Sequence, residues 1–465
     1  MAGLQGEVFV VLNDSNLMKR LLIIFISALS FVSLSAQRPA SLNPYDLNRP
    51  IGWATIAKDG SIYNLTGGSG SAVTLISTGQ DQSAEITAAL KNNNVVVLDG
   101  SNGDFLIGSG GVNWSSDKSK DRTLVGINGA TLRQMNSVTQ FHSYLDARTA
   151  NMVSHSGGYV TSVHDELQSA IDENVAEKGT SSKWYVKEGD ELYVRGYIMD
   201  YLYENGMSAE EVLSEPVKQW GVFRINGNEE KGSGSNLIIR NINFVGPGAL
   251  DMSGLDAFCL TNCHNVWVDH CSFSDGLDGC FDITSSSTGT YHSTNITISW
   301  CTFNYGPSSW NHRFCSLFNG NEAQTLNVTV ANCIWGGGIY MRTPLCNHAN
   351  VHQVNCLFDA PGPGLRAQNS SYNDSRYAIF MDHCYFAAGQ NGSNTRTYVT
   401  LEHNGKTCYN QCEGNYFANG EEPISNATMT IPYEYEPIPA ALVPSVLTSA
   451  SGAGPTLTDP LVFGN

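Results

Sequence analysis

Positive charge is scarce in this chain. It has 25 Lys and Arg against 43 Asp and Glu in 465 residues, which gives a formal net charge of −18. Outside the N-terminus there is no Lys/Arg run, and so negative a protein repels nucleic acid and anionic membrane surfaces unless it carries a local basic patch. We therefore expect neither nucleic acid nor a membrane as partner. The 41% hydrophobic content, against 15% charged residues, excludes a disordered chain and allows a large core.

Long apolar runs are lacking except near the N-terminus, where a basic start at 18–20 precedes the run Leu21–Ala36. A short basic segment, an apolar segment and small residues predict a secretory signal peptide over 18–36. The run is short for a helix that crosses a bilayer. We expect a secreted protein, extracellular or periplasmic, with 1–17 as an upstream extension and 37–465 as a single domain.

Cysteine is absent from the first half of the chain, and all twelve cysteines lie between Cys259 and Cys412. An even number in an exported protein suggests disulfides. Five of them, however, occupy the same position in a repeated strand: Cys271, Cys301, Cys333, Cys356 and Cys384. Because equivalent positions of stacked strands lie above one another, we predict a buried ladder of small hydrophobic side chains. No Cys-x-x-Cys pair accompanies them, which disfavours a metal site built from these thiols.

The repeated strand has nine residues, begins with Asn and ends with an aromatic residue. Its copies are Asn236–Phe244, Asn265–Phe273, Asn295–Phe303, Asn327–Trp335 and Asn350–Phe358, with weaker copies ending at Phe386 and Phe417. The aromatic ends lie 23 to 32 residues apart, and turns rich in Gly, Asn, Ser and Asp separate the copies. This pattern is typical of stacked β-coils, so we predict an all-β, right-handed parallel β-helix, a solenoid. The Asn residues are expected in turns, where they tolerate left-handed backbone.

Two other regions are assigned around this repeat. Residues 51–133 carry strands and Gly-rich turns and are expected to form the opening coils. Residues 137–230 break the rhythm: 166–171 has helical character, and 208–211 resembles a capping box before a helix. We predict that this stretch is a partly helical insertion packed on the solenoid. The chain from 430 onward is expected to lie back along the outside.

Three segments, in this order, resemble the pectate and pectin lyases of polysaccharide lyase family one. They are Gly52–Gly70, Asn265–Phe303 and Arg342–Asn355. The resemblance implies cleavage of pectate, which is homogalacturonan, by calcium-dependent β-elimination. In that reaction the C5 proton, α to a carboxylate, is removed while the C4 glycosidic oxygen leaves. Because negative charge builds on a group that is already anionic, a bound Ca²⁺ would neutralise it.

The resemblance also assigns the calcium ligands. Asp278 and Asp282 match the family's paired acids, and Asp256 matches an acid one coil earlier. Stacked coils lie about 5 Å apart, so these carboxylates are expected to converge on one ion. One family acid is missing, since its position is Gly254, and Asp251 is the candidate substitute.

By the same resemblance Arg342 is the proton acceptor. Because free arginine stays protonated, Arg342 alternatively stabilises an enolate-like transition state while water or hydroxide takes the proton. The family's second Arg is Asn347 here, a weaker substrate-binding residue. Arg313, one position from the family's Lys, is the candidate clamp for a uronate carboxylate. His312 is either a turn residue or a substrate contact, and Trp310 is either a sugar-stacking platform or a packing residue.

Other functions remain open from the residues alone. A pectin lyase acting on methyl-esterified pectin would not need the three calcium acids. A non-catalytic polysaccharide-binding β-helix is favoured by Asn347 and by the missing Lys. Asp269 and His270 match the family signature, but we expect them to hold turns. The polysaccharide is the one expected partner, and we expect a monomer.

Overall fold

The structure is a computed structural model. It describes residues 50, 52–115, 119–149, 164–178, 190–214, 220–250, 254–286, 292–310, 312–359, 376–387, 402–403, 405–418 and 422–461. The predicted extension at 1–17, the predicted signal peptide at 18–36 and Asp251 lie outside the described residues.

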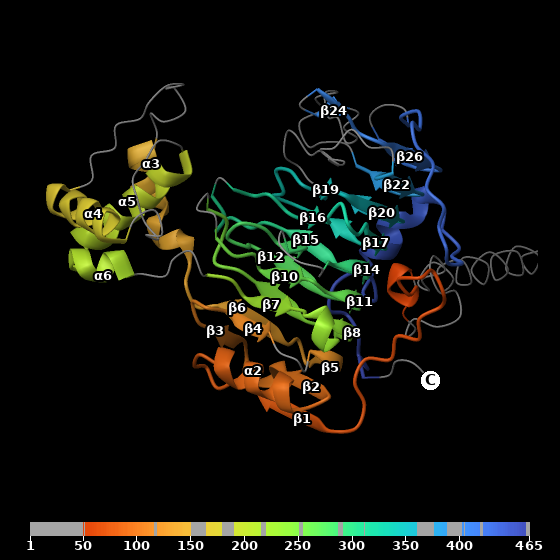
Figure 1. Cartoon of the computed structure of the whole chain (residues 1–465), viewed down its shortest axis with the longest axis horizontal. Coiled ribbons are helices and arrows are strands. Elements are labelled where there is room, and N and C mark those ends of the chain that lie inside the picture. The colour runs from red at the N-terminus through yellow and green to blue at the C-terminus, as the bar shows by residue number, and fades with distance from the viewer. Residues whose placement is uncertain are drawn as a thin grey trace, which may run out of the picture.

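The described strands build three parallel sheets that run along the same stack of coils (Figure 1). Sheet 1 consists, in spatial order, of β1 (Ala72–Ile76), β2 (Val95–Asp99), β5 (Lys120–Ile127), β8 (Ser235–Arg240), β11 (His264–Asp269), β14 (Thr294–Ser299), β17 (Leu326–Ala331), β20 (Ala349–Val354), β22 (Ile379–Asp382) and β26 (Asn410–Glu413). Sheet 2 consists of β4 (Val112–Ser115), β7 (Phe223–Asn226), β10 (Phe258–Thr261), β13 (Phe281–Thr284), β16 (Leu317–Asn319) and β19 (Leu345–Asn347).

Sheet 3 consists of β3 (Phe105–Ile107), β6 (Thr131–Gln134), β9 (Asn243–Val245), β12 (Ser272–Ser274), β15 (Thr302–Asn304), β18 (Ile334–Trp335), β21 (Leu357–Phe358), β23 (Tyr385–Phe386) and β27 (Tyr416–Phe417). In the central coils the chain visits sheet 1, sheet 3 and sheet 2 in turn and then repeats, and each strand pairs with its equivalent in the next coil. The predicted parallel β-helix is therefore confirmed. A separate antiparallel pair, β24 (Glu402–His403) and β25 (Lys406–Thr407), lies near the C-terminal end.

Two ladders predicted from the repeat fill the core. The aromatic ladder is stacked ring on ring with centroids 4.3 to 6.3 Å apart, through Phe244, Phe273, Phe303, Trp335, Phe358, Phe386 and Phe417. All twelve cysteines are free, and the five ladder cysteines are fully buried. The N–H of Cys271 points at the sulfur of Cys301, and that of Cys301 at the sulfur of Cys333, each at 3.4 Å. The thiols therefore pack as small hydrophobic groups.

Residues with left-handed backbone lie in the turns. Only some of them are the Asn residues that the sequence predicted in this conformation. Asn236, Asn265 and Asn295 have φ between 50° and 55°, whereas Asn327 and Asn350 do not adopt this conformation. A second series of left-handed residues links sheet 1 to sheet 3: Asn241, His270, Trp300, Asn332, Asn355 and His383. His270 thus holds a turn, as expected.

The insertion forms its own apolar cluster beside the coils (Figure 1). Its helices are η3 (Val138–Phe141), α3 (His142–Thr149), α4 (Asp165–Lys178), α5 (Asp190–Glu204) and α6 (Ala209–Ser214). The predicted capping box is present, because Ser208 N–H donates to Glu211 Oε2 at 2.8 Å while Glu211 N–H donates to Ser208 Oγ at 3.3 Å. Near the end of the stretch predicted as the insertion, about 137–230, strand β7 belongs to the solenoid, since it pairs with both β4 and β10.

Short helices complete the structure. These are η1 (Trp53–Thr55), α2 (Ser83–Asn92), η2 (Gly100–Asn102), η7 (Glu229–Lys231), η8 (Ala440–Leu442) and α7 (Val443–Leu447). Helix α2 was not predicted; it buries Ile86 and Leu90 against the first coils. The C-terminal segment does lie along the outside, where Ile438 N–H donates to Asn355 Oδ1 at 3.0 Å. Among the helices that the structure describes, none is long and apolar enough to span a membrane.

Candidate active site

The predicted site residues come from successive turns that lead into sheet 2. Asp256 lies two residues before β10, Asp278 three residues before β13, and Asp282 within β13. Arg313 lies four residues before β16, and Arg342 three residues before β19. Because all these strands are parallel neighbours, the structure brings the five residues to one edge of the sheet.

The outer face of sheet 2 carries two columns of side chains, because alternate residues of each strand point away from the core. Register places Arg224, Cys259 and Asp282 in the first column. The second column consists of Asn226, Thr261, Thr284, Asn319 and Asn347. Asn347 therefore shares the face of Asp282, displaced by two residues along the strand.

The three acids share one electrostatic environment. Burial raises the pKa of Asp282 to about 7, and the charge of Asp278 adds to this, while the Leu317 N–H bond at 2.8 Å and the charge of Arg342 oppose it. Burial, and then the charges of Asp282 and Asp278, raise the pKa of Asp256 well above its usual range, again opposed by Arg342. The acids are thus close enough to repel one another, and the charge of Arg342 offsets this repulsion and the cost of burial only in part.

Gly279 lets two of the acids face one point. A Cβ at Gly279 would lie 2.7 Å from Asp256 Oδ1 and 3.2 Å from Asp282 Oδ1. The third acid, Asp278, faces His312 instead: its Oδ1 lies 2.7 Å from His312 Nε2. Within the described part of the chain, no three His, Cys, Asp or Glu side chains are placed to hold a metal ion together. Two carboxylates fit a hard cation, which needs further oxygen ligands from outside the protein.

The position that corresponds to the missing family acid is filled by a hydrophobic side chain. A Cβ at Gly254 would lie 2.3 Å from Leu277 Cδ2. Leu277 is itself buried in the apolar cluster of the insertion. An acid at 254 could not be accommodated unless Leu277 moved.

Arg342 is held in an uncommon backbone conformation. Its φ is 66°, a region that few non-glycine residues adopt and that is enriched at functional sites. Its carbonyl accepts the Ser316 N–H at 2.9 Å, and its guanidinium carbon lies 4.9 Å from the centre of the Phe314 ring. The aromatic face favours the charged guanidinium.

The neighbouring loop, 305–316, carries the other predicted residues. Arg313 is partly buried, and within the described chain its Nε has no hydrogen-bond partner. His312 pairs with Asp278. Trp310 packs against the insertion cluster and donates from Nε1 to Asp146 Oδ1 at 3.1 Å. This contact favours the packing interpretation of Trp310 over the sugar-stacking one.

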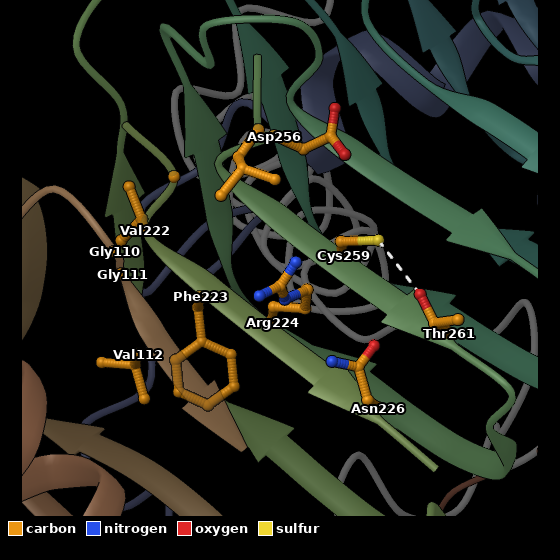
Figure 2. Close-up of a pocket in the computed structure, with 12 residues that line it drawn as sticks. Gly110, Gly111, Val112, Val222, Phe223, Arg224, Asn226, Asp256, Cys259 and Thr261 are labelled. Carbon is orange, nitrogen blue, oxygen red and sulfur yellow. Dashed lines mark hydrogen bonds between the residues drawn. The ribbon is translucent and has the colours of Figure 1, made fainter. Parts of the chain in front are cut away.

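Sequence reasoning missed Arg224. It lies on β7, in a stretch assigned to the insertion, and it lines a cavity of about 140 Å³ that also contains Asp256 and Cys259 (Figure 2). The alternation of apolar and polar residues in Phe223–Asn226 was the available signal in the sequence.

The fold is thus a parallel β-helix in which acids and arginines from successive coils lie at one edge of sheet 2. The family model described as pectate lyase matches residues 223–456, about half of the chain and starting at the first residue of β7. The chain belongs to the pectate lyase family.

The chain is similar to several individual proteins and solved structures. The pectate lyase plyB of Emericella nidulans is 32% identical over 155 residues, which cover 30% of this chain and 44% of that protein. A pectate lyase of Nicotiana tabacum is 33% identical over 142 residues, covering 26% and 33%. The matched segments thus span less than half of these relatives.

Among solved structures, the major allergen from cedar pollen aligns with a TM-score of 0.49 at 15% identity, covering 87% of this chain and 92% of that one. A pectate lyase from Paenibacillus sp. 0602 aligns with a TM-score of 0.48 at 13% identity, covering 90% and 97%.

Proposed function

We propose that this protein is a secreted polysaccharide lyase that cleaves pectate by calcium-assisted β-elimination. The observation that carries the proposal is the convergence of the Asp256 and Asp282 carboxylates over Gly279, at the sheet edge that also holds Arg342. Two carboxylates that repel each other beside a guanidinium suit an anionic substrate only if a cation joins them. Membership of the pectate lyase family supports the same reaction.

The residues divide the work by their chemistry. Asp256 and Asp282 would hold Ca²⁺, with Asp278 joining them once it is released from His312. When bound, the ion would neutralise the acids and act as a Lewis acid toward the uronate carboxylate. Asn347 offers only an uncharged amide on the outer face, so Arg313 is the residue we assign to the substrate carboxylate. A planar guanidinium suits bidentate binding of that group.

Arg342 acts at the C5 proton. As this proton leaves, the C5–H electron pair forms the C4–C5 double bond, and the glycosidic oxygen departs from C4 with the electron pair of the C4–O bond and takes up a proton from water. Two roles are open to Arg342: it accepts the proton, or it remains charged and stabilises the enolate-like carboxylate while water accepts the proton. Residual activity that still rises with pH in the Arg342→Asn variant, which has no ionisable side chain at this position, supports the second role.

The decisive experiment follows the unsaturated product, which absorbs in the near ultraviolet. Purified protein is given polygalacturonate or highly methyl-esterified pectin, with added calcium or with a chelator. The proposal expects product from polygalacturonate with calcium and none with the chelator. Product from methylated pectin in the presence of the chelator would indicate a pectin lyase. Binding of pectate without any product would indicate a non-catalytic polysaccharide-binding β-helix.

The proposal includes secretion and a monomeric state. Export with cleavage after Ala36 would leave Gln37 as the first residue. Mass spectrometry of protein recovered outside the cytoplasm tests this directly, and light scattering of the same sample tests the monomer. A retained N-terminus would contradict the export proposal.

A further inference from the structure

We propose that Arg224, with Asn226 beside it, forms a further subsite that binds a carboxylate of the polysaccharide. The subsite lies two strands from Asp282, on the side away from Arg342. The identity of the ligand as an acidic polysaccharide rests on the proposed function. The position and the unsatisfied charge of Arg224 are properties of the structure itself.

The register of sheet 2 fixes where Arg224 lies. It pairs with Cys259, which in turn pairs with Asp282, so all three point outward in one column. Neighbouring strands are about 4.8 Å apart, which places Arg224 roughly 10 Å from the Asp282 column position. Arg342 precedes β19, four strands away from β7 and so roughly 19 Å distant along the sheet. An extended chain lying across the strands would meet both ends of this row.

Arg224 differs from Arg240 and Arg133 in having no ion-pair partner among the residues that the structure describes. Arg240 pairs with Asp269, and Arg133 pairs with Asp104. Within the described residues Arg224 forms no ion pair, and its Nε is shielded from solvent without a hydrogen-bond partner. A partly desolvated guanidinium without an acceptor is costly, and a carboxylate ligand supplies charged acceptors in a geometry that matches it.

A small cavity opens beside this guanidinium. It has a volume of about 140 Å³ and is lined by backbone at Gly110 and Gly111 and by side chains that include Asn226, Thr261 and Asp256. Figure 2 shows Arg224 beside Cys259 and Asn226, with Asp256 at the far end. Sites that enclose a whole small molecule are usually about 300 Å³ or more. The cavity therefore suits one carboxylate group of a longer ligand rather than a whole oligosaccharide.

The consequence is a dependence on substrate length. A short oligogalacturonate that occupies the Asp282 and Arg342 region does not reach Arg224, whereas a longer one does. The added contact lies within the same bound chain, so it contributes affinity without a second association step. In a protein with a net charge of −18, a cation at the far end of the acid-lined edge also offsets repulsion of a polyanion.

The test compares binding of digalacturonate and hexagalacturonate by calorimetry in calcium-containing buffer. An Arg342→Asn background keeps the ligands intact. Arg224→Gln removes the charge, Arg224→Lys keeps it, and Arg133→Gln is a matched control on sheet 3. We expect Arg224→Gln to weaken hexagalacturonate binding roughly tenfold and to make the remaining affinity less dependent on salt concentration. Arg224→Lys, which keeps the charge, should recover part of the lost affinity. Digalacturonate affinity in Arg224→Gln, and both affinities in Arg133→Gln, should stay within about twofold of the background protein.

Three results would overturn the subsite. One is hexagalacturonate binding unchanged by Arg224→Gln. Another is an equal loss for both ligand lengths together with a lower melting temperature, which would show a structural role. The third is that neither ligand binds the background protein. Failure of the lyase proposal is separate: wild-type protein would give no unsaturated product, while hexagalacturonate binding would still depend on Arg224.

Discussion

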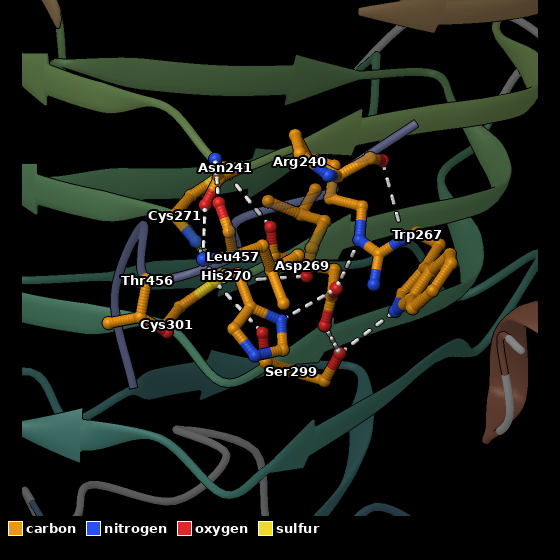
Figure 3. A network of polar contacts seen from close by, with 12 residues as sticks. Arg240, Asn241, Trp267, Asp269, His270, Cys271, Ser299, Cys301, Thr456 and Leu457 are labelled. Atoms are coloured by element: carbon orange, nitrogen blue, oxygen red, sulfur yellow. Dashed lines mark hydrogen bonds and ion pairs between the residues drawn. The ribbon is translucent and has the colours of Figure 1, made fainter. Parts of the chain in front are cut away.

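Two clusters of arginine and aspartate, on different corners of the same solenoid, are organised in opposite ways. In the corner network (Figure 3), Arg240 Nε donates to Asp269 Oδ2 at 2.8 Å, and His270 Nδ1 lies 2.7 Å from the same oxygen. Ser299 Oγ donates to Asp269 Oδ1 at 2.6 Å and accepts from Trp267 Nε1 at 2.8 Å. At the sheet 2 edge, carboxylates instead face carboxylates, and within the described residues Nε of Arg224 and of Arg313 has no hydrogen-bond partner.

The same physical force therefore gives opposite results at the two corners. Burial by itself raises the pKa of Asp269, but the charges of His270 and Arg240, together with hydrogen bonds from His270 and Ser299, bring the pKa below its ordinary value. Burial raises the pKa of Asp282 to about 7 because its surroundings do not compensate. The corner network is complete within the protein and holds the fold. At the sheet 2 edge the described residues leave the buried carboxylates without such compensation, and the proposed cation would supply it.

The largest expected effect comes from Arg342. Substitution by Asn keeps a residue that tolerates the left-handed backbone and removes the guanidinium. We expect the rate of unsaturated product formation to fall about 10³- to 10⁴-fold, because a group acting at the transferred proton is lost. The melting temperature should stay at the wild-type value. Retention of substantial activity would remove Arg342 from the chemistry.

The complementary change lies in the corner network. Asp269→Asn leaves Arg240 buried without a counter-charge, and we expect a loss of about 3 kcal/mol in the free energy of unfolding. Denaturant titration measures it. The protein that remains folded should cleave pectate at the normal rate. A stable but inactive variant would show that this corner takes part in the reaction.

Gly279→Ala tests the convergence of the two acids more finely. The added methyl group would meet Asp256 Oδ1 and Asp282 Oδ1, so we expect the calcium concentration for half-maximal rate to rise roughly tenfold. Gly337→Ala is the matched control, because a Cβ at Gly337 meets nothing within 4 Å. Equal behaviour of the two variants would argue against a shared cation over Gly279.

The smallest expected effect concerns pH and stability. Burial lowers the pKa of His352 below its ordinary 6.5 despite its contact with Asp382. Burial opposes ionisation of Asp382, but hydrogen bonds from His352, Tyr435 and His383 bring its pKa below 3.8. Below pH 3.8 the unfolded chain binds protons while Asp382 and Asp269 stay ionised in the folded protein, so stability should decline there. Between pH 7 and pH 3.8 the loss of stability through His352 is opposed by Asp282 and Asp256, whose raised pKa values let the folded protein bind protons first. Melting temperatures measured from pH 8 to pH 3 test this: they should fall below pH 3.8, and a rise in that range would contradict it.

The sequence predicted what repeats and missed what does not. The aromatic and cysteine ladders could be predicted because the same residue types return in each coil. Asp256, Asp278 and Arg342 were brought together because each lies two or three residues before a strand of one sheet. The roles of these residues stay predictions.

The missed features depend on packing that only the folded chain shows. Strand β7 is short, lacks the repeated aromatic end and follows helical segments, so it was assigned to the insertion and Arg224 with it. Two further contacts join segments distant in the sequence. One is the occupation of the Gly254 site by Leu277, and the other is the Trp310–Asp146 hydrogen bond. Neither contact can be predicted from a local sequence pattern.

The account depends most on a cation held jointly by Asp256, Asp282 and the substrate. The most direct measurement is the initial rate of unsaturated product formation from polygalacturonate, as a function of calcium concentration, for wild-type protein and Asp282→Asn. The account predicts no activity in chelator for either protein and at least a roughly tenfold higher calcium requirement for the variant. Wild-type activity that survives chelation, or identical calcium curves for the two proteins, would contradict it.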